Sequence, residues 1–522
     1  PYTFYGLLAD DAQIAAEGLS VRFHVNPQAR FSNGQAVSAE DVKFSFDTLT
    51  TNKQAHPIYG IIWDEVKDAV VLDQQTVQFN FKHNNPKLPM LIAQLSVFPK
   101  SWVSESNSEK TGFEKTAMKV PIGSGPYLLK SYDLGKQIEF IRNPDYWARD
   151  LGVRKGMFNF DEIVYKYYRD STITLEALKA GEFDFRAENN SKMWARDYKG
   201  SVFKEKKILK ENIENQNSVG IQGFVFNTRR EKFKDKRVRE ALVLAYDFEW
   251  ANRMLFYNQY KRNYSYFSNT ELAATDVMSP AEHALLEPYR DILDPRVFTT
   301  TWKPPLTTPP ASLRDNLREA IKLLNDAGWK YRDGALRNSE GQPFVINLLL
   351  AQKAFERIAA SYARNLEKLG IKLEYRTVDF ALYKRRVETK QFDMIVTSYP
   401  QEQTPGNELK SRWHSNTADV DGSSNYPGIK NPVVDELLEQ IGNTQDRSKI
   451  INLTRALDRV LLYEFYLVPH WFISSHRIAY WDKFERPETI PLYFGAESWI
   501  LSTWWFKPEY RERSVATTND HS

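Results

Sequence analysis

The chain has 522 residues, of which 42% are hydrophobic and 26% are charged; this is enough to bury a sizeable core and excludes a disordered chain. Its 70 basic and 67 acidic residues leave a net charge of +3, which gives no support to a nucleic-acid or membrane-surface partner. The length predicts roughly three or four packing units, and the lack of cysteine excludes zinc ribbons, thiol catalysis and disulfide scaffolds.

Three further features of the sequence concern the cellular compartment of the protein. A chain without cysteine suits an oxidising compartment, and a cytosolic chain that merely lacks cysteine is the alternative. No apolar run reaches the ~18 residues of a membrane-spanning helix. The sequence starts at Pro1 without a signal peptide, and its first residues are typical of the middle of a domain. We therefore expect that an N-terminal segment of the protein is missing from this sequence.

The first part of the chain predicts short strands around one capped helix. Val21, Phe23 and Val25 alternate with polar residues, as in a half-buried strand. Ser38 stands three residues before Asp41 and ahead of apolar residues at helical spacing, which predicts a capping box. The further elements predicted in this part are a strand at 77–81, a loop at 123–127 leading into a strand, a helix at 172–179 ended by Gly181, and a strand from 183.

Four segments in the middle of the chain are less regular. Residues 199–210 predict a solvated strand face, and the basic run at 229–239 predicts a solvated helix face. Residues 236–256 carry apolar residues at helical spacing and predict one long helix. Residues 280–310 are rich in proline and fit neither period, so a long surface excursion is expected there.

The clearest pattern runs from Ser312, a predicted N-cap, to Val396. Its predicted elements are a helix ended by Gly328, a strand at 344–350, a helix at 355–370, a strand at 371–377, a short helix through Leu382 and Val387, and a strand at 392–396. This β-α-β-α-β order predicts a mainly parallel sheet with right-handed crossovers. Such sheets bind ligands outside the carboxyl ends of their strands, here at 397–406. Two more helices are predicted, one starting near Pro432 and one at 450–461.

Signatures of catalysis are missing from the sequence. The eight histidines form no His-Glu-x-x-His motif, and no Walker A loop is present. Gly123-Ser124-Gly125 lacks the context of a nucleophile elbow. We therefore expect no enzyme activity, no metal and no cofactor.

Several phrases, in the right order, resemble the extracellular solute-binding proteins of dipeptide and oligopeptide ABC transporters. The phrases are RFSNG at 30–34, VSAEDVKFS at 37–45, GSGPY at 123–127, RNPDYW at 142–147, FNT at 226–228, FKDKRVREAL at 233–242 and AGW at 327–329. Two more, AYDFEW at 245–250 and AYWDKF at 479–484, are similar to one peptide-uptake subfamily.

The resemblance implies an α/β fold: a two-lobed periplasmic-binding-protein clamp with mixed α/β lobes and an extra subdomain in the first lobe. It places the first lobe at 1–235, the second at 236–468 and a return to the first lobe at 469–522. It also implies an exported, periplasmic, monomeric protein. Its partners would be an oligopeptide ligand, captured in a cleft between the lobes, and an inner-membrane ABC permease.

Ligand-binding residues follow from the resemblance and from the aromatic content. Many peptide-binding members pair an Asp with the ligand's amino terminus; the matching stretch here has Gln401 in its place, so either Glu402 substitutes or the terminus goes unread. The full set of candidates is Glu188, Asn190, Trp194, Tyr399, Gln401, Glu402, Trp413, Asn425, Tyr426, Trp471 and Trp499. The peptide would hydrogen-bond through its main chain, with aromatic side chains lining adaptable pockets.

Three alternatives remain open at this point. The same clamp binds a different solute, such as an oligosaccharide, an opine, a haem-like molecule or a nickel chelate. The chain is a secreted hydrolase, a peptidase or glycosidase on an unfamiliar scaffold. The chain is a surface interaction protein without an internal ligand.

Overall fold

The computed structural model describes residues 4–52, 55, 58–104, 120–444 and 446–510, and the chain divides into two compact units. The central unit, named for its place in the sequence, contains Glu188–Tyr198 and Asn212–Arg477; the flanking unit contains Thr3–Ala187, Lys199–Glu211 and Ile478–Ser522. Both mix helices and strands, so the predicted α/β class is confirmed. The lobe boundaries at 235 and 468 stay a prediction.

The central unit is built on a five-stranded sheet with the order β15-β14-β16-β10-β17. Its strands are β10 (Ile221–Phe226), β14 (Val345–Leu350), β15 (Lys372–Thr377), β16 (Met394–Tyr399) and β17 (Leu467–Pro469). β14 runs parallel to β15 and β16, joined by α13 (Glu356–Glu367) and α14 (Phe380–Glu388). The predicted β-α-β-α-β segment is thus confirmed. The sheet as a whole is mixed, because β10 pairs antiparallel with both β16 and β17.

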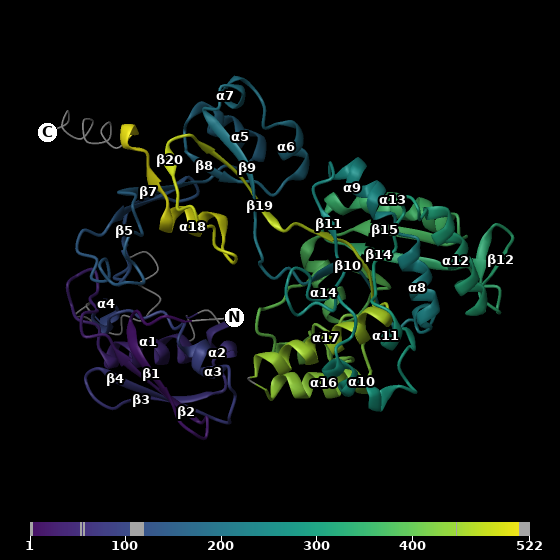
Figure 1. Cartoon of the computed structure of the whole chain (residues 1–522), viewed down its shortest axis with the longest axis horizontal. Helices are drawn as coiled ribbons and strands as arrows, with labels where there is room; N and C mark the ends of the chain where they lie inside the picture. Colours follow the sequence, from purple (N-terminus) through teal and green to yellow (C-terminus); the bar gives the residue numbers. More distant parts are fainter. Residues whose placement is uncertain (1–3, 53–54, 56–57, 105–119, 445, 511–522) are drawn as a thin grey trace. The chain divides into compact units, whose positions relative to one another are not determined.

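Besides α13 and α14, the described part of the central unit contains nine helices. They are α6 (Ser191–Arg196), α8 (Lys236–Leu244), α9 (Phe248–Leu255), α10 (Pro280–Leu286), α11 (Arg296–Thr299), α12 (Leu313–Asp326), α15 (Glu408–Trp413), α16 (Pro432–Gly442) and α17 (Arg447–Tyr463). α12 packs on α8, and α16 lies beside α17 (Figure 1). The smaller elements are the pair β11 (Lys261–Arg262) and β18 (Trp471–Phe472), the hairpin β12 (Lys330–Arg332) and β13 (Ala335–Arg337), and short 3-10 turns at Glu231–Phe233, Glu287–Tyr289, Lys353–Phe355 and Ser415–Thr417.

The flanking unit holds several smaller sheets. One antiparallel sheet holds β1 (Ala9–Ile14), β2 (Ser20–Val25), β4 (Thr76–Phe81) and β3 (Val66–Val71), and a second holds β5 (Tyr127–Asp133), β6 (Gln137–Arg142) and β7 (Glu162–Lys166). A third holds β8 (Phe185–Ala187), β19 (Ser475–Trp481) and β9 (Ile208–Glu214), of which the last three residues of β9 and the first three of β19 are counted with the central unit. A further pair is β20 (Phe484–Glu485) and β21 (Trp505–Phe506). Its helices are α1 (Ala39–Thr51), α2 (Ile58–Ile62), α3 (Leu88–Ile92), α4 (Lys100–Ser104), α5 (Ser171–Ala180), α7 (Ser201–Lys204) and α18 (Ala496–Thr503).

Local signals placed many of these elements correctly. The Ser38–Asp41 capping box begins α1, Gly181 ends α5 in a left-handed conformation, and Pro432 is the first residue of α16. Each depends on contacts within one turn of helix, so the sequence alone reveals them.

Three predictions were wrong. The helix expected at 236–256 is broken between α8 and α9, because Asp247 caps α9 by accepting from the Trp250 amide and Tyr246 turns into the core. The excursion at 280–310 contains α10 and α11, since Ser279 forms a capping box that begins α10. The strand face at 199–210 starts with α7 instead.

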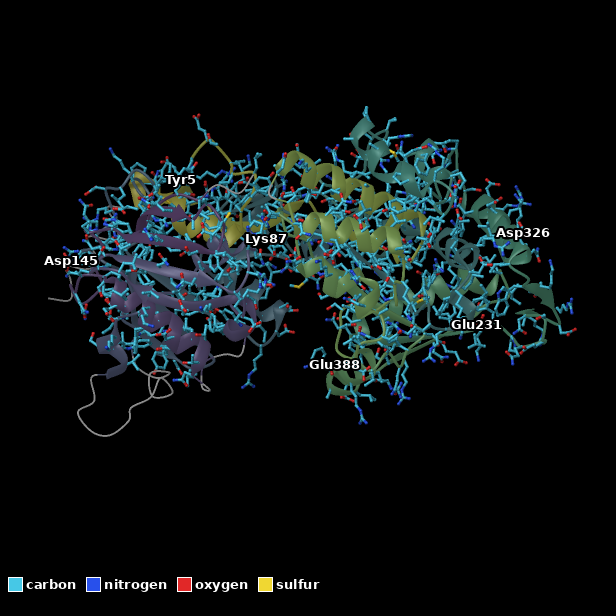
Figure 2. The ribbon with its side chains drawn as sticks, turned by 90° about the horizontal axis from the view of Figure 1, so that it is seen from below. Tyr5, Lys87, Asp145, Glu231, Asp326 and Glu388 are labelled. Atoms are coloured by element: carbon cyan, nitrogen blue, oxygen red, sulfur yellow. The ribbon has the colours of Figure 1, made fainter. Side chains whose placement is uncertain are left out.

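The basic run at 229–239 is only partly solvated, which corrects the predicted solvated helix face. Glu231 is exposed near the start of this run (Figure 2), but Arg239 is 3% exposed. The Arg239 guanidinium donates to the carbonyls of Phe233, Lys234 and Glu464. Buried carbonyl groups without other partners favour an inward arginine over a solvated one.

Gly220, the residue before β10, fits its place only without a side chain. Its φ is +68°, and a Cβ would lie 2.0 Å from the Tyr399 carbonyl oxygen. We expect Gly220→Ala to destabilise the fold by about 1–3 kcal/mol more than Gly328→Ala. Gly328 also has a positive φ, of +88°, but a Cβ there meets nothing within 4 Å. Urea unfolding of both variants measures the difference, and equal losses would contradict the close approach to Tyr399.

Candidate functional site

The carboxyl ends of β14, β15 and β16 lie at one edge of the central sheet, together with the start of β10 and the end of β17. We call this the carboxyl edge. Apolar side chains gather in the segments that leave it: Phe355 and Trp471 are half-buried, and Phe380 is 70% exposed. A large exposed aromatic side chain at this edge marks a surface able to bind an apolar group.

Neutral polar groups lie beside these aromatic rings. The Ser398 hydroxyl donates to the Gln222 Oε1 at 3.5 Å, and the Gln222 Nε2 is 3.3 Å from the His470 Nδ1. Burial, assisted by the charge of Arg262, lowers the pKa of His470 to about 3, so its imidazole is neutral at physiological pH. The edge therefore offers amide and hydroxyl groups that match the donors and acceptors of a peptide main chain.

Trp471 is held in place by stacking. Its ring lies 4.8 Å from the His470 ring at an interplanar angle of 12°, and 6.2 Å from the Phe355 ring at 25°. Phe256 packs against it at 4.4 Å. A half-buried tryptophan fixed by three rings is a preorganised contact surface that loses little conformational entropy on binding.

The structure brings together three predicted aromatic residues beyond β16. The Tyr399 ring is 5.9 Å from the Trp413 ring and 6.0 Å from the Tyr426 ring. Tyr399 and Trp413 are 2% and 0% exposed, whereas Tyr426 is half-buried. Tyr399 and Trp413 thus pack in the core, whereas the Tyr426 side chain is partly accessible and could contact a ligand.

The polar candidates near β16 differ in what their side chains do. Gln401 is buried and accepts from the Arg412 guanidinium at 3.1 Å, whereas Glu402 is exposed. Asn425 is fully buried; its amide donates to the carbonyls of His414 and Ile429 and accepts from backbone amides, so it organises the loop before α16.

The candidates around α6 form a second group in the central unit. Asn190 caps α6, and the Glu188 carboxylate accepts from the Asn190 amide at 2.7 Å and from the Tyr198 hydroxyl at 3.0 Å. Trp194 is 5% exposed, with its ring 5.0 Å from that of Tyr198. Trp499 belongs to the flanking unit, where it is 4% exposed and its ring lies 5.3 Å from the Trp504 ring. The assignment of all these residues to the ligand stays a prediction.

Sequence reasoning missed four residues of the carboxyl edge: Gln222, Phe355, Phe380 and His470. Phe355 and Phe380 lie a few residues after the predicted strands at 344–350 and 371–377. The rule that ligands bind outside the carboxyl ends of parallel strands, which placed the site at 397–406, therefore applied to them as well. Gln222 and His470 gave no such signal, because Gln222 lies in β10, which runs antiparallel to β16, and His470 follows β17, which pairs with the other side of β10.

Two further properties of the described residues concern metal ions and membranes. Within the described ranges, no group of three His, Asp or Glu side chains is arranged to hold a metal ion. None of the helices described here is both long and apolar enough to cross a membrane.

Comparisons with known proteins agree with the resemblance seen in the sequence. The family model for bacterial extracellular solute-binding proteins, family 5 Middle, matches residues 3–419. YejA of Escherichia coli (strain K12) is 36% identical over 97% of this chain and 82% of its own length. The "Probable peptide-binding protein YejA" of Agrobacterium fabrum is 36% identical over 94% and 80%, and the "Peptidoglycan-binding protein YepA" of the same organism 31% over 97% and 82%.

Solved structures share the fold at low sequence identity. A periplasmic oligopeptide-binding protein of Thermotoga maritima is 18% identical with a TM-score of 0.71, covering 96% of this chain and 90% of that one. AppA of Bacillus subtilis, solved with a nonapeptide, is 20% identical with a TM-score of 0.65 over 96% and 90%. The predicted periplasmic-binding-protein fold is confirmed, and this chain belongs to the bacterial extracellular solute-binding proteins of family 5.

Proposed function

We propose that this solute-binding protein captures oligopeptides at the carboxyl edge of its central sheet and delivers them, in the periplasm, to an ABC permease of the inner membrane. The observation that carries the proposal is the edge itself, where the Trp471 ring stands beside the neutral polar groups of Gln222 and Ser398. Main-chain hydrogen bonds together with adaptable aromatic contacts suit a ligand whose side chains vary.

The relatives support peptides as the ligand class. One relative at 36% identity carries a peptide-binding name. The side chains of Gln222 and Ser398 add to this, because a neutral amide and hydroxyl match amide groups without demanding a charged substrate. A protein that binds without chemistry is also the simplest role for a site whose polar groups are an amide, a hydroxyl and a neutral imidazole.

Native mass spectrometry of the purified protein tests the ligand class directly. After denaturation, we expect a set of intact peptides of similar length to be released. A single non-peptide species would overturn the peptide proposal, and cleaved products that accumulate with time would favour a hydrolase.

We further propose the clamp motion that the family resemblance implies. Addition of peptide should then reduce the radius of gyration of the protein, as measured by small-angle scattering.

Trp471→Ala tests the site. We expect this variant to lose at least about tenfold in peptide affinity, because a fixed aromatic contact at an interface contributes more than about 1.4 kcal/mol. The matched control is Trp329→Ala, which removes another half-buried tryptophan of the central unit. Trp329 packs 4.3 Å from Phe344, which precedes β14 and so lies at the opposite end of that strand. Equal affinities in calorimetry for wild type and Trp471→Ala would contradict this site.

A second candidate ligand is a peptidoglycan fragment. The observation that favours it is the relative named "Peptidoglycan-binding protein YepA", which is 31% identical over 97% of this chain. Calorimetry with a muramyl peptide and with a linear peptide of the same sequence separates the two candidates. Binding of the muramyl form alone would replace the linear peptide as the proposed ligand.

A further inference from the structure

Gln222 and its two neighbours form a polar row across three strands of the central sheet. Gln222 lies in β10 and pairs directly with Ser398 of β16, while His470 follows β17 on the other side of β10. The His470 backbone amide donates to the Gln222 carbonyl at 2.8 Å, which fixes the register of this row. The Gln222 side chain therefore stands between those of Ser398 and His470.

These two neighbours decide which way the Gln222 amide points. Its Nε2 is 3.3 Å from the His470 Nδ1, and its Oε1 accepts from the Ser398 hydroxyl at 3.5 Å. An amide nitrogen only donates, so the His470 Nδ1 accepts and the imidazole proton lies on Nε2. His470 is 0% exposed, and burial lowers its pKa to about 3, so this acceptor stays unprotonated at physiological pH.

Aromatic packing holds the His470 ring in this orientation. The Phe224 ring lies 4.2 Å away at an interplanar angle of 88°, and the Trp471 and Phe355 rings stack on the imidazole at 4.8 and 6.2 Å. To turn its Nδ1 away from Gln222, the imidazole would have to displace these close-packed rings. The orientation of the Gln222 amide is thus set by the core of the central unit.

One end of the Gln222 amide remains for a ligand. A primary amide has two N–H groups and two lone pairs, and among the described residues this side chain bonds to His470 and Ser398 alone. Because the two partners flank Gln222 on opposite sides, the unused N–H and lone pair lie side by side at the end of the amide. Gln222 is partly exposed and Ser398 is exposed, so this end is within reach of a ligand.

We propose that Gln222 reads the main chain of one ligand residue, accepting from its N–H and donating to its C=O, and that His470 is the positioning residue for this contact. The N–H and C=O of one residue in an extended peptide point the same way, and adjacent donor and acceptor atoms of a primary amide match them. Proline and N-methylated residues lack this N–H and are rejected at that one position. The inference rests on the proposed function and narrows its substrate class.

Calorimetry with N-methylated peptides tests the inference. The probes are Ala-Ala-Phe-Ala-Ala and its forms with one N-methyl group at the second, third, fourth or fifth residue. One form should bind the wild-type protein at least about tenfold more weakly than the parent, because the Gln222 Oε1 loses its donor. In Gln222→Met this loss should shrink to about twofold, with the other forms unchanged. The matched control is Gln440→Met, a partly exposed glutamine of α16 that bonds to Glu436, and it should behave as wild type.

Two variants of His470 separate positioning from packing. His470→Phe keeps an aromatic ring but removes the acceptor, so the Gln222 amide is free to turn over and the tenfold loss should fall to about threefold. His470→Asn keeps an acceptor without the ring and should restore most of the discrimination. Equal discrimination in the two variants would overturn the positioning role.

The remaining outcomes tell this inference apart from the function on which it rests. If no N-methylated form binds the wild-type protein about tenfold more weakly, the inference fails whatever the variants do. An N-methyl loss of the same size in wild type and Gln222→Met would also overturn it, but would leave peptide binding intact. Failure of the wild-type protein to bind the parent peptide would overturn the sequence-tolerant peptide binding itself.

Discussion

Arg459→Met is expected to destabilise the protein by about 3–5 kcal/mol, because it leaves a buried carboxylate without its countercharge. The Arg459 Nε donates to the Glu282 Oε2 at 2.7 Å, and the two side chains are 4% and 1% exposed. The same guanidinium donates to the Asp276 carbonyl at 2.7 Å. The pair joins α17 to α10, so its loss should loosen that contact before the rest of the unit.

Chemical denaturation measures this effect, and two further variants interpret it. Arg455→Met is the matched control on the same helix, since Arg455 is a more solvent-accessible residue whose Nε donates to the Glu271 carbonyl; it should cost less than about 1 kcal/mol. The double variant Arg459→Met, Glu282→Gln should recover part of the loss, because no uncompensated charge remains buried. A loss below about 1 kcal/mol in Arg459→Met would show that Glu282 is not isolated from solvent.

Asp458→Ala is expected to cost about 3 kcal/mol at pH 7, since it removes the acceptor for three buried donors. The Asp458 carboxylate accepts from the Ser265 hydroxyl at 2.6 Å and from the amides of Tyr266 and Ala274 at 2.8 and 2.9 Å. These bonds fix the loop between β11 and α10, which has no regular structure of its own. Urea unfolding measures the loss, and a variant as stable as wild type would contradict this role.

The cost of Asp458→Ala should also depend on pH. Burial raises the pKa of Asp458 to about 6 from its ordinary value of 3.8. The folded state therefore holds this proton more tightly than the unfolded state, so ionisation weakens the fold above pH 6 and the penalty disappears below about pH 4. The stability difference between wild type and Asp458→Ala should grow, by up to roughly 3 kcal/mol, as the pH falls from 7 to 4. A pH-independent difference would contradict the raised pKa.

The sequence by itself determined the elements whose signals are local. The capping box at Ser38, the glycine that ends α5 and the apolar periodicity of α12 and α13 act within one or two turns of helix. The β-α-β-α-β order followed from the alternation of such signals. The ordered family phrases identified the family for the same reason, because they are contiguous in the chain.

Only the tertiary structure decided what depends on residues far apart in sequence. Gln222 meets Ser398 and His470 across three strands, and Arg459 meets Glu282 across two helices. Trp413 and Asn425, predicted as ligand residues, are buried among partners that no periodicity reveals. The break at Tyr246 has the same cause. A helical pattern in the sequence indicates which face of a helix is apolar. Whether the helix ends at a given residue and buries a ring such as that of Tyr246 depends on the strands and side chains that surround it.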